Sequence, residues 1–134
     1  MSISFQQIHQ ISIDAAWYTQ PFKGFCLDSR KLEAGQIFIA LNSYSQPEKT
    51  RLFAENALNA GVLAVISETD LGLADEWVCP EVRYLMGEWQ KQYLQAVDPV
   101  TALRGIAVTG TNGKTTISRL IAELISSQGQ GCAV

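Results

Sequence analysis

Two continuous apolar runs, separated by a segment with helical periodicity, constrain the fold of this chain more than any other feature. The runs are QIFIAL at 36–41 and VLAVI at 62–66, and each has the length of a buried strand. Between Glu48 and Ala60 apolar residues recur at helical spacing, and Gly61 follows in the position of a C-terminal cap. A strand, a helix and a strand in this order predict a parallel pair with a right-handed crossover and helices on both faces of the sheet. We therefore expect an α/β fold.

The N-terminal part of the chain is predicted to add a short helix and another strand. ISFQQI at 3–8 has Ser4 three positions before Gln7, which is the pattern of a capping box. A short helix therefore begins there. GFCLD at 24–28 is predicted as a strand, and a turn through Gly35 connects it to the next strand.

The region before residue 105 carries weaker signals. VRYL at 82–85 is predicted as an edge strand after a loop, and 86–97 as a helix with its apolar residues on one side. Asp98-Pro99 breaks that helix. The break is the predicted boundary between a first domain, residues 1–99, and the start of a second domain, residues 100–134.

Composition excludes several classes of function. The chain has 134 residues, 10 basic and 13 acidic, and no Lys/Arg block marks it as a nucleic-acid or anionic-membrane binder. Cys26, Cys79 and Cys132 are widely spaced, which argues against a disulfide framework or a zinc site and favours a reducing cytoplasm. His9 is the only histidine, so histidine triads and most metal clusters are excluded, and it is predicted to lie on the first helix. No apolar run approaches the ~20 residues of a membrane span.

GIAVTGTNGKTTISRL, at 105–120, has the order strand, glycine loop, amphipathic helix. The start of such a helix presents unsatisfied N–H groups and the positive end of the helix dipole to an anion. Gly110 and Gly113 let the backbone approach phosphate oxygens without a Cβ in the way. The segment therefore predicts a phosphate-binding loop.

Three side chains of this loop have the types that phosphate loops use. Lys114 is predicted to contact the β- and γ-phosphates, Thr115 to coordinate Mg²⁺, and Thr116 to add a donor. The standard G-x-x-x-x-G-K-[ST] spacing would place a glycine where Val108 stands. The alternative is a strand-to-helix turn whose threonines cap the helix and whose lysine is solvated.

VTGTNGKTT resembles the nucleotide loop of the Mur ligases and of folylpolyglutamate synthetases, in which G-T-x-G-K-[ST] replaces the standard spacing. Two upstream segments, LDSRKLEAGQIFIAL at 27–41 and AENALNAGVLAVISE at 54–68, resemble the DSR segment and the helix–strand unit of the N-terminal domain in the MurE type. MurF-type ligases usually have serine where Thr111 stands, and MurD-type ligases lack the DSR domain. The MurE type is the better match, with a MurF-type fragment as an alternative.

This resemblance implies an ATP-dependent ligase of peptidoglycan synthesis that acts in the cytoplasm as a monomer. It would add the third amino acid, meso-diaminopimelate or L-lysine, to UDP-N-acetylmuramoyl-L-alanyl-D-glutamate through an acyl phosphate. The cofactors implied are ATP and Mg²⁺, with Lys114 as the catalytic residue and Thr115 as the metal ligand. The ATP-binding residues implied by the motif are Gly110, Thr111, Asn112, Gly113, Lys114, Thr115 and Thr116.

The N-terminal domain of this family holds the UDP part of the substrate. Carried over by motif position, Leu27 and Ser29 would contact uracil. Tyr44, Ser45 and Gln46 would reach the uridine and its diphosphate. Relatives have a G-x-x-x-D-G-H-like run after the strand, where this chain has NSYSQPEK.

Other conspicuous residues have structural interpretations beside functional ones. Asp28 and Arg30 are either an ion pair that holds the strand end or direct ligands. Trp17, Trp77 and Trp89 are predicted to be core residues rather than stacking platforms, because no basic residues are interleaved with them.

The resemblance also implies parts that the 134 residues do not contain. A Mur ligase has a strand with the Mg²⁺ carboxylate, a lysine that becomes carbamylated, adenine-binding residues and a C-terminal domain. We therefore expect this chain to be the N-terminal part of such a ligase and to be inactive alone. The alternative from another functional class is a non-catalytic module that binds a nucleotide-sugar.

Overall fold

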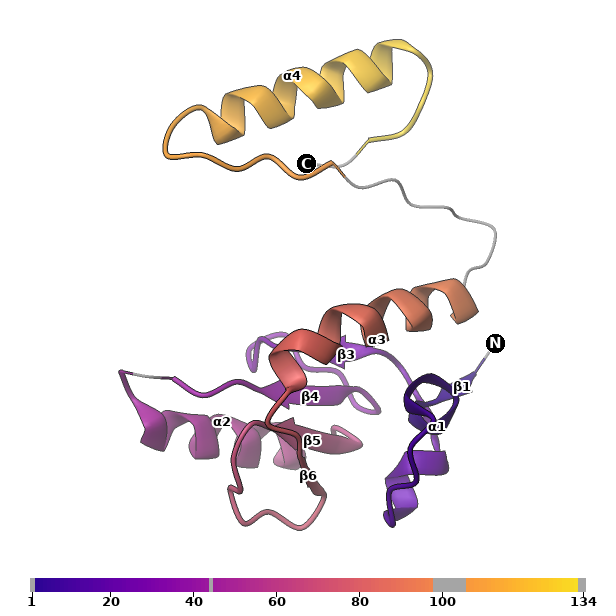
Figure 1. Cartoon of the computed structure of the whole chain (residues 1–134), viewed down its shortest axis with the longest axis vertical. Coiled ribbons are helices and arrows are strands. Elements are labelled where there is room, and N and C mark those ends of the chain that lie inside the picture. The colour runs from indigo at the N-terminus through magenta and orange to yellow at the C-terminus, as the bar shows by residue number, and fades with distance from the viewer. Residues whose placement is uncertain (1, 44, 98–105, 133–134) are drawn as a thin grey trace. The chain divides into compact units, whose positions relative to one another are not determined.

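The computed structural model describes residues 2–43, 45–97 and 106–132. The chain divides into two compact units, Met1–Val100 and Thr101–Val134 (Figure 1). The boundary predicted at Asp98-Pro99 lies outside the described residues. Within these described ranges, no helix combines the length and the apolarity needed to cross a bilayer.

The first unit is built on a four-stranded parallel sheet with the strand order β3-β4-β5-β6. In β4 and β5, Ile37 lies opposite Ala64 and Ala40 opposite Ser67, which confirms the predicted parallel pair. Strand β3 also runs parallel to β4, although only a loop connects them. The bounds are β3 Phe25–Cys26, β4 Ile37–Ala40, β5 Ala64–Ser67 and β6 Glu76–Val78.

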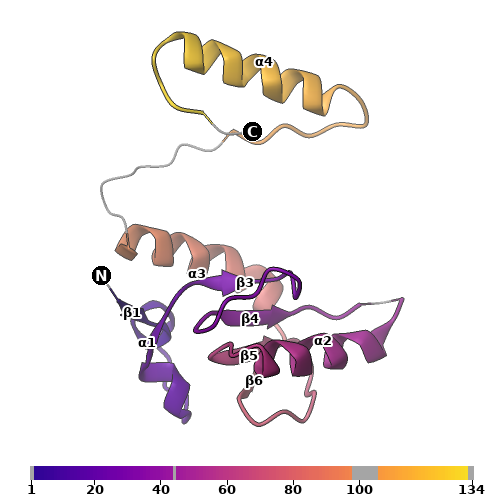
Figure 2. The ribbon, with the colours of Figure 1, turned by 180° about the vertical axis from the view of Figure 1, so that it is seen from behind.

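Helices cover both faces of this sheet, as Figures 1 and 2 show from opposite sides. Helix α2, Pro47–Asn59, packs on the face that carries Phe38 and Ala40. Helices α1, Phe5–His9, and α3, Val82–Val97, pack on the face that carries Ile37 and Ile39. All four residues of β4 are buried. A strand covered on both sides has no solvated face, which explains its continuous apolar sequence.

The N-terminal segment forms a small annex to the sheet. Strand β1, Ile3–Ser4, pairs antiparallel with β2, Pro21–Phe22, and a 3₁₀ helix, η1, spans Ala16–Thr19. The backbone N–H of Ser4 donates to Gln7 Oε1 at 2.9 Å, so the predicted capping box and short helix are confirmed.

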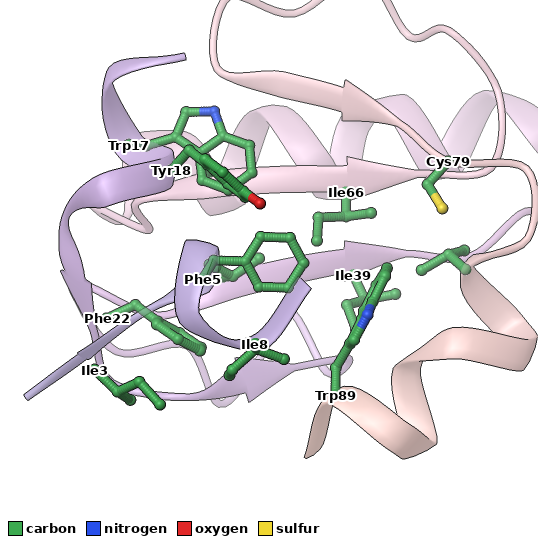
Figure 3. Close-up of a cluster of buried hydrophobic side chains, with 13 residues drawn as sticks. Ile3, Phe5, Ile8, Trp17, Tyr18, Phe22, Ile39, Ile66, Cys79 and Trp89 are labelled. Atoms are coloured by element: carbon green, nitrogen blue, oxygen red, sulfur yellow. The ribbon is translucent and has the colours of Figure 1, made fainter. Parts of the chain in front are cut away.

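An aromatic cluster joins the annex to the sheet (Figure 3). Phe5 is fully buried, and its ring meets Trp89 edge-on with 5.1 Å between the ring centroids. Trp17 and Trp89 are buried, and Trp77 is partly buried against the same cluster. The prediction that the three tryptophans belong to the core is therefore confirmed.

The prediction was wrong between Glu68 and Leu85. The edge strand is β6, in the stretch predicted as a loop, and VRYL at 82–85 is the first turn of α3. VRYL has strand-forming residues, but the buried Val82 and Trp89 are seven positions apart on one helical face, so packing overrides local propensity. The Glu76 carboxylate holds the loop before β6, because it accepts the N–H groups of Leu71 and Leu73 and the Ser67 hydroxyl.

Helix α2 buries small residues instead of its largest apolar ones. Thr50, Ala54 and Ala57 are buried, whereas Leu52 and Phe53 are 51% and 42% exposed. Small side chains toward the sheet let the helix backbone approach it closely. The helix itself is confirmed.

The second unit contains helix α4, Lys114–Ser127, which confirms the predicted helix. The predicted strand at 105–108 is not formed over Ile106–Val108. A strand is stabilised by hydrogen bonds to a partner, and the described residues provide none there. The apolar face of α4 is exposed at Ile117, Leu120 and Leu124.

His9 lies in the aromatic cluster, in surroundings that disfavour its charged form. Its ring stacks on Phe5 with 5.3 Å between the centroids and lies 4.7 Å from the Trp77 ring. Its Nδ1 atom is buried without a hydrogen-bond partner among the described residues. Burial lowers the pKa of His9 below its ordinary value of 6.5, because the charged form is poorly solvated there.

The lowered pKa predicts a loss of stability in mild acid. The unfolded chain protonates His9 near pH 6.5 while the folded chain resists protonation, so stability is complete above that pH and falls toward the lower folded-state pKa. We expect the urea midpoint to fall between about pH 7.5 and about pH 5.5. The variant His9→Phe keeps the ring stacking without the titration and should show a smaller fall. Equal falls in both proteins would contradict this account.

Candidate functional site

A pocket of about 100 Å³ opens at the carboxyl end of β4. Ligands of open α/β sheets bind outside the carboxyl ends of the strands, so its position is that of a binding site. Its half-exposed residues are Leu27, after β3, and Phe53, on α2. The lining residues are Leu27, Phe38, Ile39, Ala40, Leu41, Thr50 and Phe53.

Ser29 lies half-buried in a turn, two residues after the pocket-lining Leu27. The Arg30 guanidinium donates from Nε and from Nη2 to the two carboxylate oxygens of Asp28, each at 2.9 Å. Hydrogen bonds from the Arg30 side chain, then from its backbone, lower the pKa of Asp28 to about 2. Lys31 N–H donates to the Asp28 carbonyl oxygen at 2.9 Å and closes the turn. The geometry therefore agrees with the ion-pair interpretation of Asp28 and Arg30.

The loop after β4 is fastened to the first turn of α2. Ser43 N–H donates to Thr50 Oγ1 at 3.2 Å, and Gln46 N–H donates to Ser43 Oγ at 3.2 Å. The hydroxyl oxygens of Ser43 and Ser45 are 3.3 Å apart. Ser45 and Gln46 are exposed beside this anchor, and Tyr44 lies outside the described residues.

An ionic group that the sequence analysis missed holds the start of the same loop. Arg83 contacts both carboxylate oxygens of Glu68, at 2.5 and 3.1 Å, and donates to the Asn42 carbonyl oxygen at 3.1 Å. Glu68 also accepts the backbone N–H of Asn42. Burial alone would raise the pKa of Glu68, but these hydrogen bonds from Arg83 and Asn42 outweigh it and lower the pKa. The group ties the ends of β4 and β5 to α3.

The glycine loop has the backbone geometry that an anion site requires. Gly110 has φ 148° and Gly113 has φ 76°, which side-chain-bearing residues rarely adopt. The first helical bond runs from Ile117 N–H to the Gly113 carbonyl oxygen at 2.9 Å. The N–H groups of Lys114, Thr115 and Thr116 therefore have no acceptor within the helix.

The side chains of this loop also fit a magnesium–nucleotide complex. Lys114 Nζ donates to the Gly110 carbonyl oxygen at 2.5 Å, so its ammonium group lies over the loop. Thr111, Asn112, Thr115 and Thr116 are exposed. In the part of the chain that the structure describes, no three acidic, histidine or cysteine side chains form a metal cluster. Other ligands of a magnesium ion on Thr115 would come from phosphate and water, as Mg²⁺ prefers.

Comparison with known proteins finds relatives of this chain. No family model matches the chain. The UDP-N-acetylmuramoyl-L-alanyl-D-glutamate–2,6-diaminopimelate ligase of Haemophilus influenzae is 37% identical over 116 residues, and the ligase of the same name from Ralstonia nicotianae is 38% identical over 120. A solved structure of such a ligase is 75% identical, with a TM-score of 0.82 over 97% of this chain. The chain is homologous to the N-terminal part of the MurE-type ligases.

The match covers most of this chain and a smaller part of each relative. The two alignments cover 81% and 80% of this chain but 23% and 22% of the relatives, and the chain covers 26% of the solved structure. The chain thus spans about a quarter of the length of these MurE-type proteins. The homology therefore supports the α/β fold of the N-terminal part directly.

The ion pair between Arg83 and Glu68 predicts a difference between two arginine variants. Glu68 has 12% side-chain exposure, so Arg83→Met leaves a largely buried carboxylate without its main partner. We expect a loss of about 1–3 kcal/mol in the free energy of unfolding at neutral pH. The control Arg51→Met removes an exposed helical pair with Glu55 and should cost less than about 0.5 kcal/mol.

Urea denaturation followed by circular dichroism measures both variants. Equal losses in Arg83→Met and Arg51→Met would contradict the role assigned to the buried pair.

Proposed function

We propose that this chain is the UDP-binding N-terminal part, with the start of the ATP-binding part, of a MurE-type ligase. The ligase adds the third amino acid, meso-diaminopimelate or L-lysine, to UDP-N-acetylmuramoyl-L-alanyl-D-glutamate in peptidoglycan synthesis. The homology supports this assignment. The geometry of the pocket supports the proposed UDP site. Leu27, expected at the uracil, lines a pocket whose Thr50 is hydrogen-bonded to the loop expected at the diphosphate.

In this proposal residues 1–99 form the UDP-binding domain. Leu27 contacts the uracil ring in the pocket, with Ser29 beside it in the Asp28–Arg30 turn. Tyr44, Ser45 and Gln46 face the uridine and its diphosphate. Glu68 and Arg83 act indirectly, by holding the loop that carries these residues.

Residues 100–134 are the proposed start of the ATP-binding domain. With ATP bound there, the D-glutamate side-chain carboxylate would accept the γ-phosphoryl group with release of ADP, and the incoming amine would then displace inorganic phosphate from the acyl phosphate. The N–H groups of the loop at 110–116 and the dipole of α4 hold the phosphates. Lys114 exchanges the Gly110 carbonyl oxygen for phosphate oxygens and neutralises charge between the β- and γ-phosphates. Thr115 provides a hydroxyl ligand to Mg²⁺.

The whole enzyme is proposed to be a cytoplasmic monomer without nucleic-acid or membrane partners, and the 134-residue chain alone to lack ligase turnover. The exposed apolar face of α4 supports the expected lack of turnover, because a phosphate loop needs a packed helix and sheet to hold its geometry. A MurF-type fragment is the alternative within the same enzyme class.

A non-catalytic nucleotide-sugar-binding module is the second candidate function. It is favoured by the first unit, which has its own sheet and two buried clusters within Met1–Val100. A reading frame that continues past Val134 would favour the ligase, and UDP binding by a protein without such a continuation would favour the module.

Calorimetric titration of UDP into the 134-residue chain tests the substrate side. We expect weak but detectable binding, and the variant Leu27→Ala to weaken it about tenfold, because the leucine side chain loses apolar contact with the base. Leu52→Ala is the matched control, since both leucines are 51% exposed and only Leu27 lines the pocket.

Two outcomes would contradict the proposal. One is the absence of heat from UDP at high protein concentration. The other is an equal effect of the Leu27 and Leu52 substitutions on the affinity for UDP.

A further inference from the structure

Thr50 is a buried polar residue in an otherwise apolar pocket. Its exposure is 4%, and the other side chains that line the pocket are leucine, isoleucine, alanine and phenylalanine. Burying a hydroxyl group is costly unless its hydrogen-bonding capacity is used. The neighbouring buried positions of the helix are Ala54 and Ala57, so Thr50 is the polar exception on this face of α2.

The Thr50 hydroxyl uses only half of its hydrogen-bonding capacity within the protein. Its oxygen accepts the N–H of Ser43 at 3.2 Å. A hydroxyl also has one proton to donate, and no acceptor for it occurs among the described residues. Ser67, also buried and polar, differs in this respect, because its hydroxyl donates to the Glu76 carboxylate. Thr50 therefore retains a donor at a buried position.

We propose that Thr50 is a specificity-determining residue whose hydroxyl donates to a ring carbonyl oxygen of the base bound in this pocket. The inference rests on the proposed function, in which that base is the uracil of UDP. Leu27 and Phe53 supply apolar contact for a planar ring, and one buried donor matches a ring carbonyl.

The bond from Ser43 gives Thr50 a second effect. Because the Ser43 N–H occupies one lone pair of Oγ1, the hydroxyl proton is directed away from that bond. The same oxygen thus holds the loop after β4 and orients the donor. Thr50 could affect binding by holding the loop or by contacting the base directly. The affinities of two ligands distinguish these roles.

The experiment compares Thr50→Val with Thr50→Ser in the 134-residue chain. Valine keeps the size of threonine but has no hydroxyl, and serine keeps the hydroxyl. Affinities for UDP are measured by calorimetry and affinities for uridine by NMR titration. Uridine lacks the diphosphate, so its affinity carries no contribution from the contacts proposed between the loop and the phosphates. We expect Thr50→Val to weaken the binding of UDP and of uridine by the same factor, about tenfold. The affinities of Thr50→Ser should stay within about threefold of those of the unchanged chain.

Three results would overturn the inference. They are unchanged affinities in Thr50→Val, a loss of affinity for UDP without a loss for uridine, and a loss of affinity in Thr50→Ser equal to that in Thr50→Val. If Thr50→Val does not fold by circular dichroism, Thr50→Ala removes the same hydroxyl with a residue that the helix accepts at 54 and 57. Absence of UDP binding by the unchanged chain would instead overturn the proposed function, so the two failures are distinguishable.

Discussion

The burial of β4 between two helical layers is the constraint on which the rest of the first unit depends. Ile37 and Ile39 pack toward α1 and α3, while Phe38 and Ala40 pack toward α2. The strand therefore has no register in which one face could be solvated, and its parallel neighbours align with it. This alignment brings the carboxyl ends of the strands to one edge. The pocket, the loop after β4 and the group formed by Glu68 and Arg83 all lie at that edge.

The site at this edge is held mainly by polar contacts to backbone atoms. Thr50 accepts the Ser43 N–H, and Glu68 and Arg83 together bind the N–H and the carbonyl oxygen of Asn42. The loop is thus fixed at two points. The glycine loop of the second unit follows a different principle, because the donors proposed to bind phosphate are those that the start of α4 leaves unsatisfied.

Sequence patterns predicted the parts of the fold in which local signal and packing agree. The continuous apolar strands, the capping box at Ser4 and the helix after Gly113 are examples. The prediction failed at β6 and at the start of α3, since VRYL has strand propensity while its Val82 belongs to a helical face. At the candidate site, Leu27 was expected from its motif. Thr50 and Phe53 were not expected there. The side of α2 that meets the sheet depends on the close packing of its alanines.

The most direct test of a UDP site at the edge of the parallel sheet is an NMR titration of the ¹⁵N-labelled chain with UDP. A UDP site at this edge predicts that the amide signals of Leu27, Ser29, Ser43 and Phe53 shift together, with one apparent affinity. Shifts confined to residues 110–116, or no shifts at a large excess of UDP, would contradict it.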